Sequence, residues 1–112
     1  MKYPASKGAP DANQAAIVEA YETLGCSVID LHSIGYGTPD LLIGFGHRLD
    51  QLVEVKIPGK KLKTNQLEFA EAWRGRKPIV VRSVDDVERH VQRMHEILNR
   101  SLFAHTAFDD FA

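Results

Sequence analysis

Residues 39–57 read PDLLIGFGHRLDQLVEVKI, and this stretch decides the fold. It holds two short apolar runs, residues 40–45 and residues 51–57, in which Leu, Ile, Val and Phe predominate. The five residues between them begin with a glycine and include His47, Arg48 and Asp50. Short apolar runs joined by a glycine-containing polar connection predict two antiparallel strands that pair as a hairpin.

The segments before this hairpin predict one helix and one further strand. Ile17, Val18, Tyr21 and Leu24 recur at helical spacing and end at Gly25. Asp11, with Gln14 three residues later, is typical of a helix start. Residues 26–31 are short and apolar enough for a strand, and residues 32–38 (HSIGYGT) form a loop.

The segments after the hairpin predict two helices and a fourth strand. A loop at residues 58–61 leads to a helix from Thr64 or Asn65 to about Trp73. We expect the Trp73 indole in the core, and the less favoured alternative is a platform on which a base stacks. Residues 79–82 predict a strand, and Ser83 with Asp86 predicts a capped helix to about Asn99. The order α-β-β-β-α-β-α predicts an α/β fold with a mixed sheet flanked by helices.

Length and composition are those of one ordinary globular domain. The chain has 112 residues, and we place the domain at residues 11–99, after a flexible lead at residues 1–10. The tail at residues 100–112 is apolar enough to pack on the core or on a partner chain. Fourteen Lys and Arg against 15 Asp and Glu give no overall basic excess for nucleic acid.

Several classes of protein are excluded by simple counts. Cys26 is the only cysteine, which rules out an intramolecular disulfide and a cysteine-based zinc site. No apolar run approaches the roughly 20 residues that cross a bilayer, and the N-terminus lacks the apolar region of a signal peptide. We therefore expect a cytoplasmic protein that has no membrane partner.

Three ionisable residues near the hairpin suggest a site. Asp40 lies where a loop meets a strand, and strand alternation puts Glu54 and Lys56 on one face with Val55 directed into the core. Two carboxylates close together are unfavourable unless a cation offsets their repulsion, and Mg²⁺ prefers such oxygen ligands. The alternative for Glu54 and Lys56 is an ordinary ion pair on the surface of a half-exposed strand.

Pro39-Asp40 followed by Glu54-Val55-Lys56 resembles the signature of the PD-(D/E)xK nucleases. Within that superfamily the chain is most similar to the small VRR-type nuclease domains, including stand-alone ones from phages and bacteria. The resemblance covers roughly residues 11–90. Its supporting motifs are NQAAIV at 13–18, GYGTPDLLIG at 35–44, KLKTNQ at 61–66 and VVR at 80–82, where Ser83 replaces the expected second arginine.

The resemblance implies a restriction-endonuclease-like α-β-β-β-α-β core and a Mg²⁺- or Mn²⁺-dependent deoxyribonuclease. Asp40, Glu54 and the Val55 main-chain carbonyl resemble the metal ligands, and Lys56 matches the catalytic lysine. Gln66 matches a glutamine beside the active site, although it could be a solvated helix residue. The resemblance further implies a homodimer that cuts junction-like or otherwise branched DNA.

Other residues are secondary candidates. Gln14 stands where many relatives carry a helical glutamate, so it could hold a water but brings no charge. Ser33 matches a serine that assists some junction-resolving relatives, or it is a turn residue. A basic cluster, formed by Lys60, Lys61 and Lys63, follows the Glu54 strand and is a candidate phosphate contact or a solvated loop.

Two alternative functions remain open at the level of sequence. The first is a non-catalytic DNA-binding or assembly module that has kept the nuclease fold, which the neutral net charge and Gln14 favour slightly. The second is a sequence-specific restriction-type enzyme, which is disfavoured because the chain offers no added recognition segment.

Overall fold

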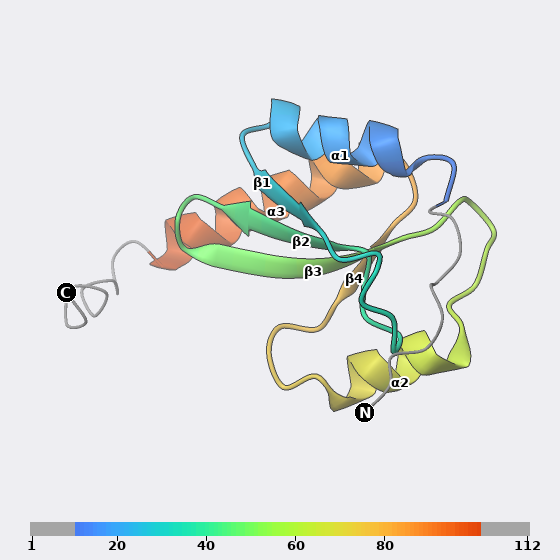
Figure 1. Cartoon of the computed structure of the whole chain (residues 1–112). Coiled ribbons are helices and arrows are strands. Elements are labelled where there is room, and N and C mark those ends of the chain that lie inside the picture. The colour runs from blue at the N-terminus through green and yellow to red at the C-terminus, as the bar shows by residue number, and fades with distance from the viewer. Residues whose placement is uncertain (1–10, 102–112) are drawn as a thin grey trace.

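The computed structural model describes residues 11–101, and the predicted lead at 1–10 and most of the predicted tail, residues 102–112, lie outside this range. The predicted element order is confirmed (Figure 1). The elements are α1 (Gln14–Thr23), β1 (Ser27–Asp30), β2 (Leu41–Phe45), β3 (Leu49–Val55), α2 (Thr64–Ala72), β4 (Ile79–Val81) and α3 (Val84–Ser101).

The four strands form one mixed sheet in the order β1-β2-β3-β4. The first two pairings are antiparallel, and β3 pairs with β4 in parallel. Leu41 lies opposite Val53 in the hairpin, and Val55 lies opposite Val81 in the parallel pair. A parallel pair needs a crossover connection, and residues 56–78, which contain α2, supply it.

The two faces of the sheet are covered differently. Figure 1 shows α1 and α3 on one face and α2 on the other. Alternate strand residues point toward α1 and α3 and form the core with residues of those helices. Its fully buried members include Leu41, Ile43, Val53, Val55 and Val81 from the strands, and Ile17, Tyr21, Val87 and Met94 from the helices. The intervening strand positions, Glu54 among them, face the α2 side.

The hairpin connection is shorter than predicted. β3 already begins at Leu49, which pairs with Phe45, so only Gly46, His47 and Arg48 form the turn. Gly46 and His47 both adopt positive φ, which closes a tight turn between twisted strands. A side chain at Gly46 would collide with Leu98 of α3, so glycine also lets α3 pack against the turn.

The prediction that Asp11 starts the first helix is wrong. α1 begins at Gln14, after a turn in which the Gln14 amide donates to the Asp11 carbonyl at 2.9 Å. The Asp11 carboxylate instead accepts the Ile57 amide at 3.1 Å. A long-range partner has therefore replaced the local capping bond that the spacing of Asp11 and Gln14 suggested.

Other expected boundaries shift by one or two residues. β1, β2 and β4 are each shorter than predicted, and α3 continues to Ser101, beyond the expected end of the domain. The Ser83 cap is confirmed, because the Asp86 amide donates to the Ser83 hydroxyl at 3.2 Å. Within residues 11–101, no helix is both long and apolar enough to span a bilayer.

A buried polar pair joins α1 to α3. The Tyr21 hydroxyl lies 2.6 Å from Nδ1 of His90. Burial, aided by the positive charge of Arg76, lowers the pKa of His90 from 6.5 to about 4. Burial also raises the pKa of Tyr21. In the neutral tautomer of His90 that carries its proton on Nε2, Nδ1 accepts the Tyr21 hydroxyl.

We expect this pair to make the fold sensitive to mild acid. The His90 pKa is lower in the folded chain than in the unfolded chain, so its contribution is complete above pH 6.5 and is lost as pH falls toward 4. The urea midpoint should therefore fall across this window. His90→Gln, which keeps hydrogen-bonding atoms but does not titrate, should show a shallower fall. Equal slopes in the two proteins would contradict this account.

Candidate active site

Asp40 is placed at the point where β2 separates from β3. The last paired residues of the hairpin are Leu41 and Val53, so Asp40 lies one residue before the paired part of β2 and Glu54 one residue after the paired part of β3. The Asp40 main-chain carbonyl accepts the Leu31 amide at 2.7 Å, which fixes the end of the 31–40 loop. Its Oδ2 accepts the Val55 amide at 2.9 Å. Asp40 thus lies one residue before β2 begins, and its side chain bonds a main-chain amide of β3.

Glu54 and Lys56 lie on the α2 side of the sheet, as alternation predicts. Only 5% of Glu54 and 4% of Lys56 is exposed, and Asp40 is 6% exposed. Lys56 Nζ lies 3.6 Å from Oε2 of Glu54. This burial rules out the alternative of an ordinary surface ion pair. Buried charges are costly unless they are paired or hold an ion.

Gln66 joins α2 to this cluster. Its Nε2 donates to Oε2 of Glu54 at 2.9 Å, and its Oε1 accepts the Lys63 amide at 2.8 Å. Gln66 is therefore not a solvated helix residue. One side chain both caps the start of α2 and holds a Glu54 oxygen, which ties the position of the helix to the site.

A hard cation fits the donor atoms gathered here. The N–H and C=O of one strand residue point to the same side, so the Val55 carbonyl faces the side on which its amide meets Asp40. Two carboxylates and one carbonyl are hard oxygen donors, which suit Mg²⁺ or Mn²⁺ with several waters retained. Residues 11–101 contain no group of three or more His, Cys, Asp or Glu suited to a metal. Any cation here would depend on this smaller set and on water.

Within residues 11–101, neither accessory candidate makes a side-chain hydrogen bond or an ion pair with the cluster. Gln14 is buried as the first residue of α1, and its Oε1 finds no hydrogen-bond partner among those residues. Ser33 is exposed in a turn closed by the Ile34 amide and the Leu31 carbonyl. This geometry favours the interpretation of Ser33 as a turn residue.

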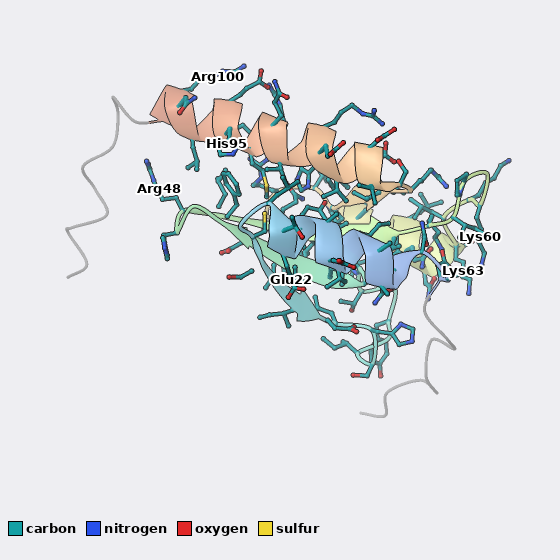
Figure 2. The ribbon with its side chains drawn as sticks, turned by 90° about the horizontal axis from the view of Figure 1, so that it is seen from above. Glu22, Arg48, Lys60, Lys63, His95 and Arg100 are labelled. Carbon is teal, nitrogen blue, oxygen red and sulfur yellow. The ribbon has the colours of Figure 1, made fainter. Side chains whose placement is uncertain are left out.

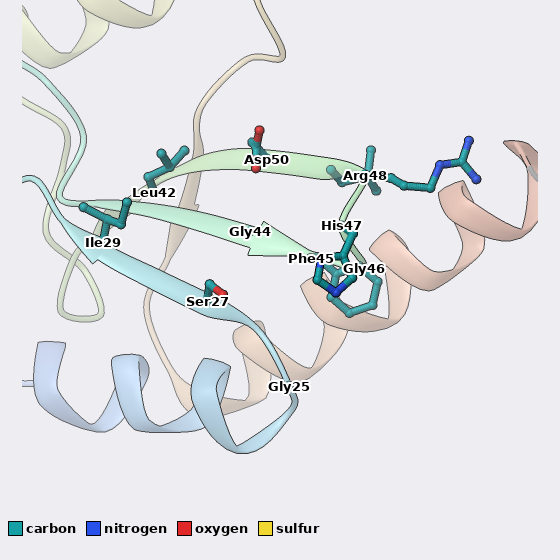
Figure 3. A pocket seen from close by; sticks show the side chains of 11 residues that line it. Gly25, Ser27, Ile29, Leu42, Gly44, Phe45, Gly46, His47, Arg48 and Asp50 are labelled. Atoms are coloured by element: carbon teal, nitrogen blue, oxygen red, sulfur yellow. The ribbon is translucent and has the colours of Figure 1, made fainter. Parts of the chain in front are cut away.

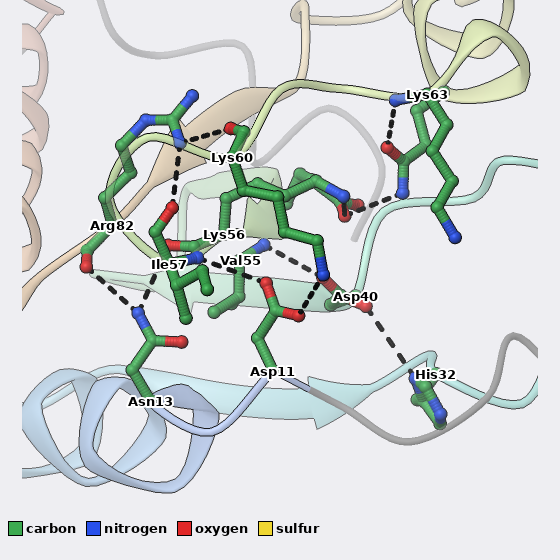
Figure 4. A network of polar contacts seen from close by, with 12 residues as sticks. Asp11, Asn13, His32, Asp40, Val55, Lys56, Ile57, Lys60, Lys63 and Arg82 are labelled. Carbon is green, nitrogen blue, oxygen red and sulfur yellow. Dashed lines mark hydrogen bonds and ion pairs between the residues drawn. The ribbon is translucent and has the colours of Figure 1, made fainter.

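Two polar residues that the sequence pattern did not indicate for the site, His32 and Asn13, lie beside it (Figure 4). His32 Nδ1 lies 3.8 Å from Oδ1 of Asp40. The Asn13 amide donates to the main-chain carbonyls of Lys56 and Arg82 at 3.2 and 2.9 Å. Each of these residues borders a predicted helix, strand or loop, but only the fold brings them to one place.

The basic cluster is held beside the site by Asp11 and Arg82. Asp11 Oδ1 lies 3.5 Å from Lys60 Nζ and so ties this lysine to the end of β3. Arg82 donates to the carbonyls of Ile57 and Lys60 at 3.1 and 2.6 Å. Lys60, Lys61 and Lys63 are exposed. Figure 2 shows Lys60 and Lys63 at the end of the molecule opposite Arg48 and Arg100.

A separate pocket lies away from Asp40 and Glu54. It is formed by the exposed face of β1 and β2 and by the hairpin turn, with Ser27, Ile29, Gly44, Arg48 and Asp50 among its lining residues (Figure 3). Glu54 instead lines a small cleft between α2, the 37–39 loop and β4, together with Gln66. The candidate chemistry therefore belongs to the α2 cleft.

Comparisons of the chain with protein-family models, curated proteins and solved structures give no match. The nuclease resemblance therefore depends on the motifs and on the geometry described above.

Gly37 sets how closely the loop before Asp40 approaches α2. Its φ is +73°, and a Cβ there would overlap the main-chain oxygen of Asn65. Gly59 has a similar φ of +84° but no atom within 4 Å of such a Cβ. Gly59→Ala is therefore a matched control that adds the backbone strain without the collision.

We expect Gly59→Ala to lower the free energy of unfolding by about 1 kcal/mol. Gly37→Ala should cost at least about 1 kcal/mol more, because α2 must move away from the sheet. Urea titration of the two variants measures the difference. Equal losses would show that α2 is not tightly seated on this loop.

Proposed function

We propose that this protein is a metal-dependent deoxyribonuclease of the PD-(D/E)xK type. The observation that carries the proposal is the burial of Asp40, Glu54 and Lys56 at one end of the sheet, beside a basic loop. A fold gains little stability from such a cluster, because the desolvation of each charge offsets much of the attraction. Buried clusters of charged side chains are common at functional sites.

Each residue has a role that follows from its position. Asp40, Glu54 and the Val55 carbonyl would hold Mg²⁺ or Mn²⁺, with Asp40 oriented by the Val55 amide. When bound, such an ion lowers the pKa of a coordinated water and offsets charge on a phosphate. Lys56 supplies a cation, next to Glu54, for the negative charge that develops on the phosphoryl oxygens. Gln66 keeps the Glu54 carboxylate in place.

The basic cluster supports DNA as the substrate. Lys60, Lys61 and Lys63 lie in the loop that follows the strand carrying Glu54, and their ammonium groups are exposed. Phosphate contacts of this kind position a nucleic acid without reading its sequence. We include in the proposal a preference for branched DNA and a symmetric homodimer, since so small a domain covers little DNA alone.

A non-catalytic DNA-binding module is the second candidate. Gln14 favours it, because an uncharged amide stands where many nucleases of this type have a helical acid. Lys60, Lys61 and Lys63 would then bind DNA that the protein does not hydrolyse.

Cleavage assays separate the two candidates. Labelled duplex, single-stranded, flap and four-way-junction DNA should be cut in Mg²⁺ or Mn²⁺ and spared in EDTA. Lys56→Ala and Glu54→Gln should each reduce the rate at least about a hundredfold, because charge stabilisation or metal binding is lost. The control is Asp50→Asn, an exposed acid on the same strand and face, which should retain full activity.

Binding of these DNAs without cleavage by the unaltered protein would favour the binding module. Cleavage that survives both Lys56→Ala and Glu54→Gln would place the chemistry elsewhere.

A further inference from the structure

An aromatic pair stands exposed at the end of α2. Phe69 and Trp73 are stacked, with ring centroids 5.4 Å apart and planes 14° apart. Trp73 is 44% exposed, so the expectation that its indole lies in the core is wrong. The helix ends at Ala72, and Trp73 follows as an extended C-cap residue. A tryptophan left this exposed is an unusual use of a large apolar side chain.

We propose that the Phe69–Trp73 pair is a stacking platform for an unpaired base of a DNA strand whose backbone is bound at the active site. The inference rests on the proposed nuclease function and adds to it a preference for single-stranded or unpaired regions. Aromatic side chains beside cations are the usual means of holding single strands, because every base has a face that can stack.

The indole has a neighbour on one face and another at one edge. Phe69 stacks on one face of the indole. Gly75 passes close to the indole edge, where an added Cβ would lie 2.7 Å from Nε1 of Trp73. A ring with such neighbours loses less freedom when a base stacks on it than a ring without them.

The charges around the platform suit a phosphate backbone. Arg74 is the next residue, and Lys77 Nζ binds the carbonyls of Ala70 and Glu71 at the end of α2, at 2.7 and 3.2 Å. The acids of α2, Glu68 and Glu71, project about 140–160° away from Trp73 around the helix. Arg76 belongs to a different contact, because it donates to Gln51 of β3.

The distance between Trp73 and the active site suits a single DNA strand that contacts both. Trp73 follows Gln66, the residue that binds Glu54, by seven positions. At 1.5 Å per residue this separates them by about 10 Å along the helix, and brings them to nearly the same side of it. That length is close to three stacked nucleotides at about 3.4 Å each. A paired base hides its faces within the duplex, so only an unpaired base can reach the indole.

The sequence provides its own reporter, because Trp73 is the only tryptophan. The full-length chain, in EDTA to prevent cleavage, is titrated with a single-stranded oligonucleotide and with a blunt duplex of the same sequence. We expect saturable quenching of tryptophan emission by the single strand and little by the duplex. Binding measured by anisotropy without any change in emission would overturn the proposal.

Three variants define the contribution of the ring. Trp73→Ala should weaken single-strand binding roughly tenfold or more, since a stacked base is lost, whereas Trp73→Phe should retain most of the affinity. Leu67→Ala removes another exposed apolar side chain from α2 and should leave binding unchanged. Equal losses for Leu67→Ala and Trp73→Ala would overturn the proposal. So would a Trp73→Ala variant that changes from dimer to monomer in sedimentation while binding DNA normally.

The outcome is separable from that of the nuclease proposal. Quenching by single strands with no cleavage of any DNA would keep the platform and reject the nuclease. Cleavage without quenching would keep the nuclease and reject the platform.

Discussion

The site depends on one hydrogen bond, in which the Asp40 carboxylate accepts the Val55 amide at 2.9 Å. β2 and β3 are paired up to Leu41 and Val53, and at the next position of β2 it is the Asp40 side chain that reaches β3. The Val55 N–H would be a buried donor without this carboxylate, and an unsatisfied buried donor costs about 1–3 kcal/mol. The same bond that completes the sheet therefore fixes the first acid of the site beside Glu54.

The helix α2 is then placed by the site as much as by apolar packing. It has no fully buried residue, and its main specific contacts to the sheet side are the Gln66 bond to Glu54 and the close approach of Gly37 to Asn65. Polar contacts with the cluster thus position α2 on one face of the sheet, while apolar packing of α1 and α3 stabilises the other face.

The sequence predicted the element order, the face shared by Glu54 and Lys56, and the inward direction of Val55, because these follow from local periodicity. It did not predict the partners of Asp11, Asn13 and Arg82, which lie 22 to 69 residues away along the chain. Asp11 was assigned to a helix start, because a local capping pattern cannot show that a distant amide competes for the carboxylate. Trp73 was assigned to the core for a similar reason, since helical spacing does not reveal that α2 buries only part of one face.

The central claim is that the two acids and the Val55 carbonyl bind a divalent cation. Paramagnetic broadening by Mn²⁺ in ¹H–¹⁵N spectra tests it without any substrate. The account predicts that low Mn²⁺ first broadens the amides of Asp40, Val55 and Lys56, that excess Mg²⁺ reverses the effect, and that Glu54→Gln weakens it. Broadening centred elsewhere, or unchanged by Glu54→Gln and Asp40→Asn together, would contradict it.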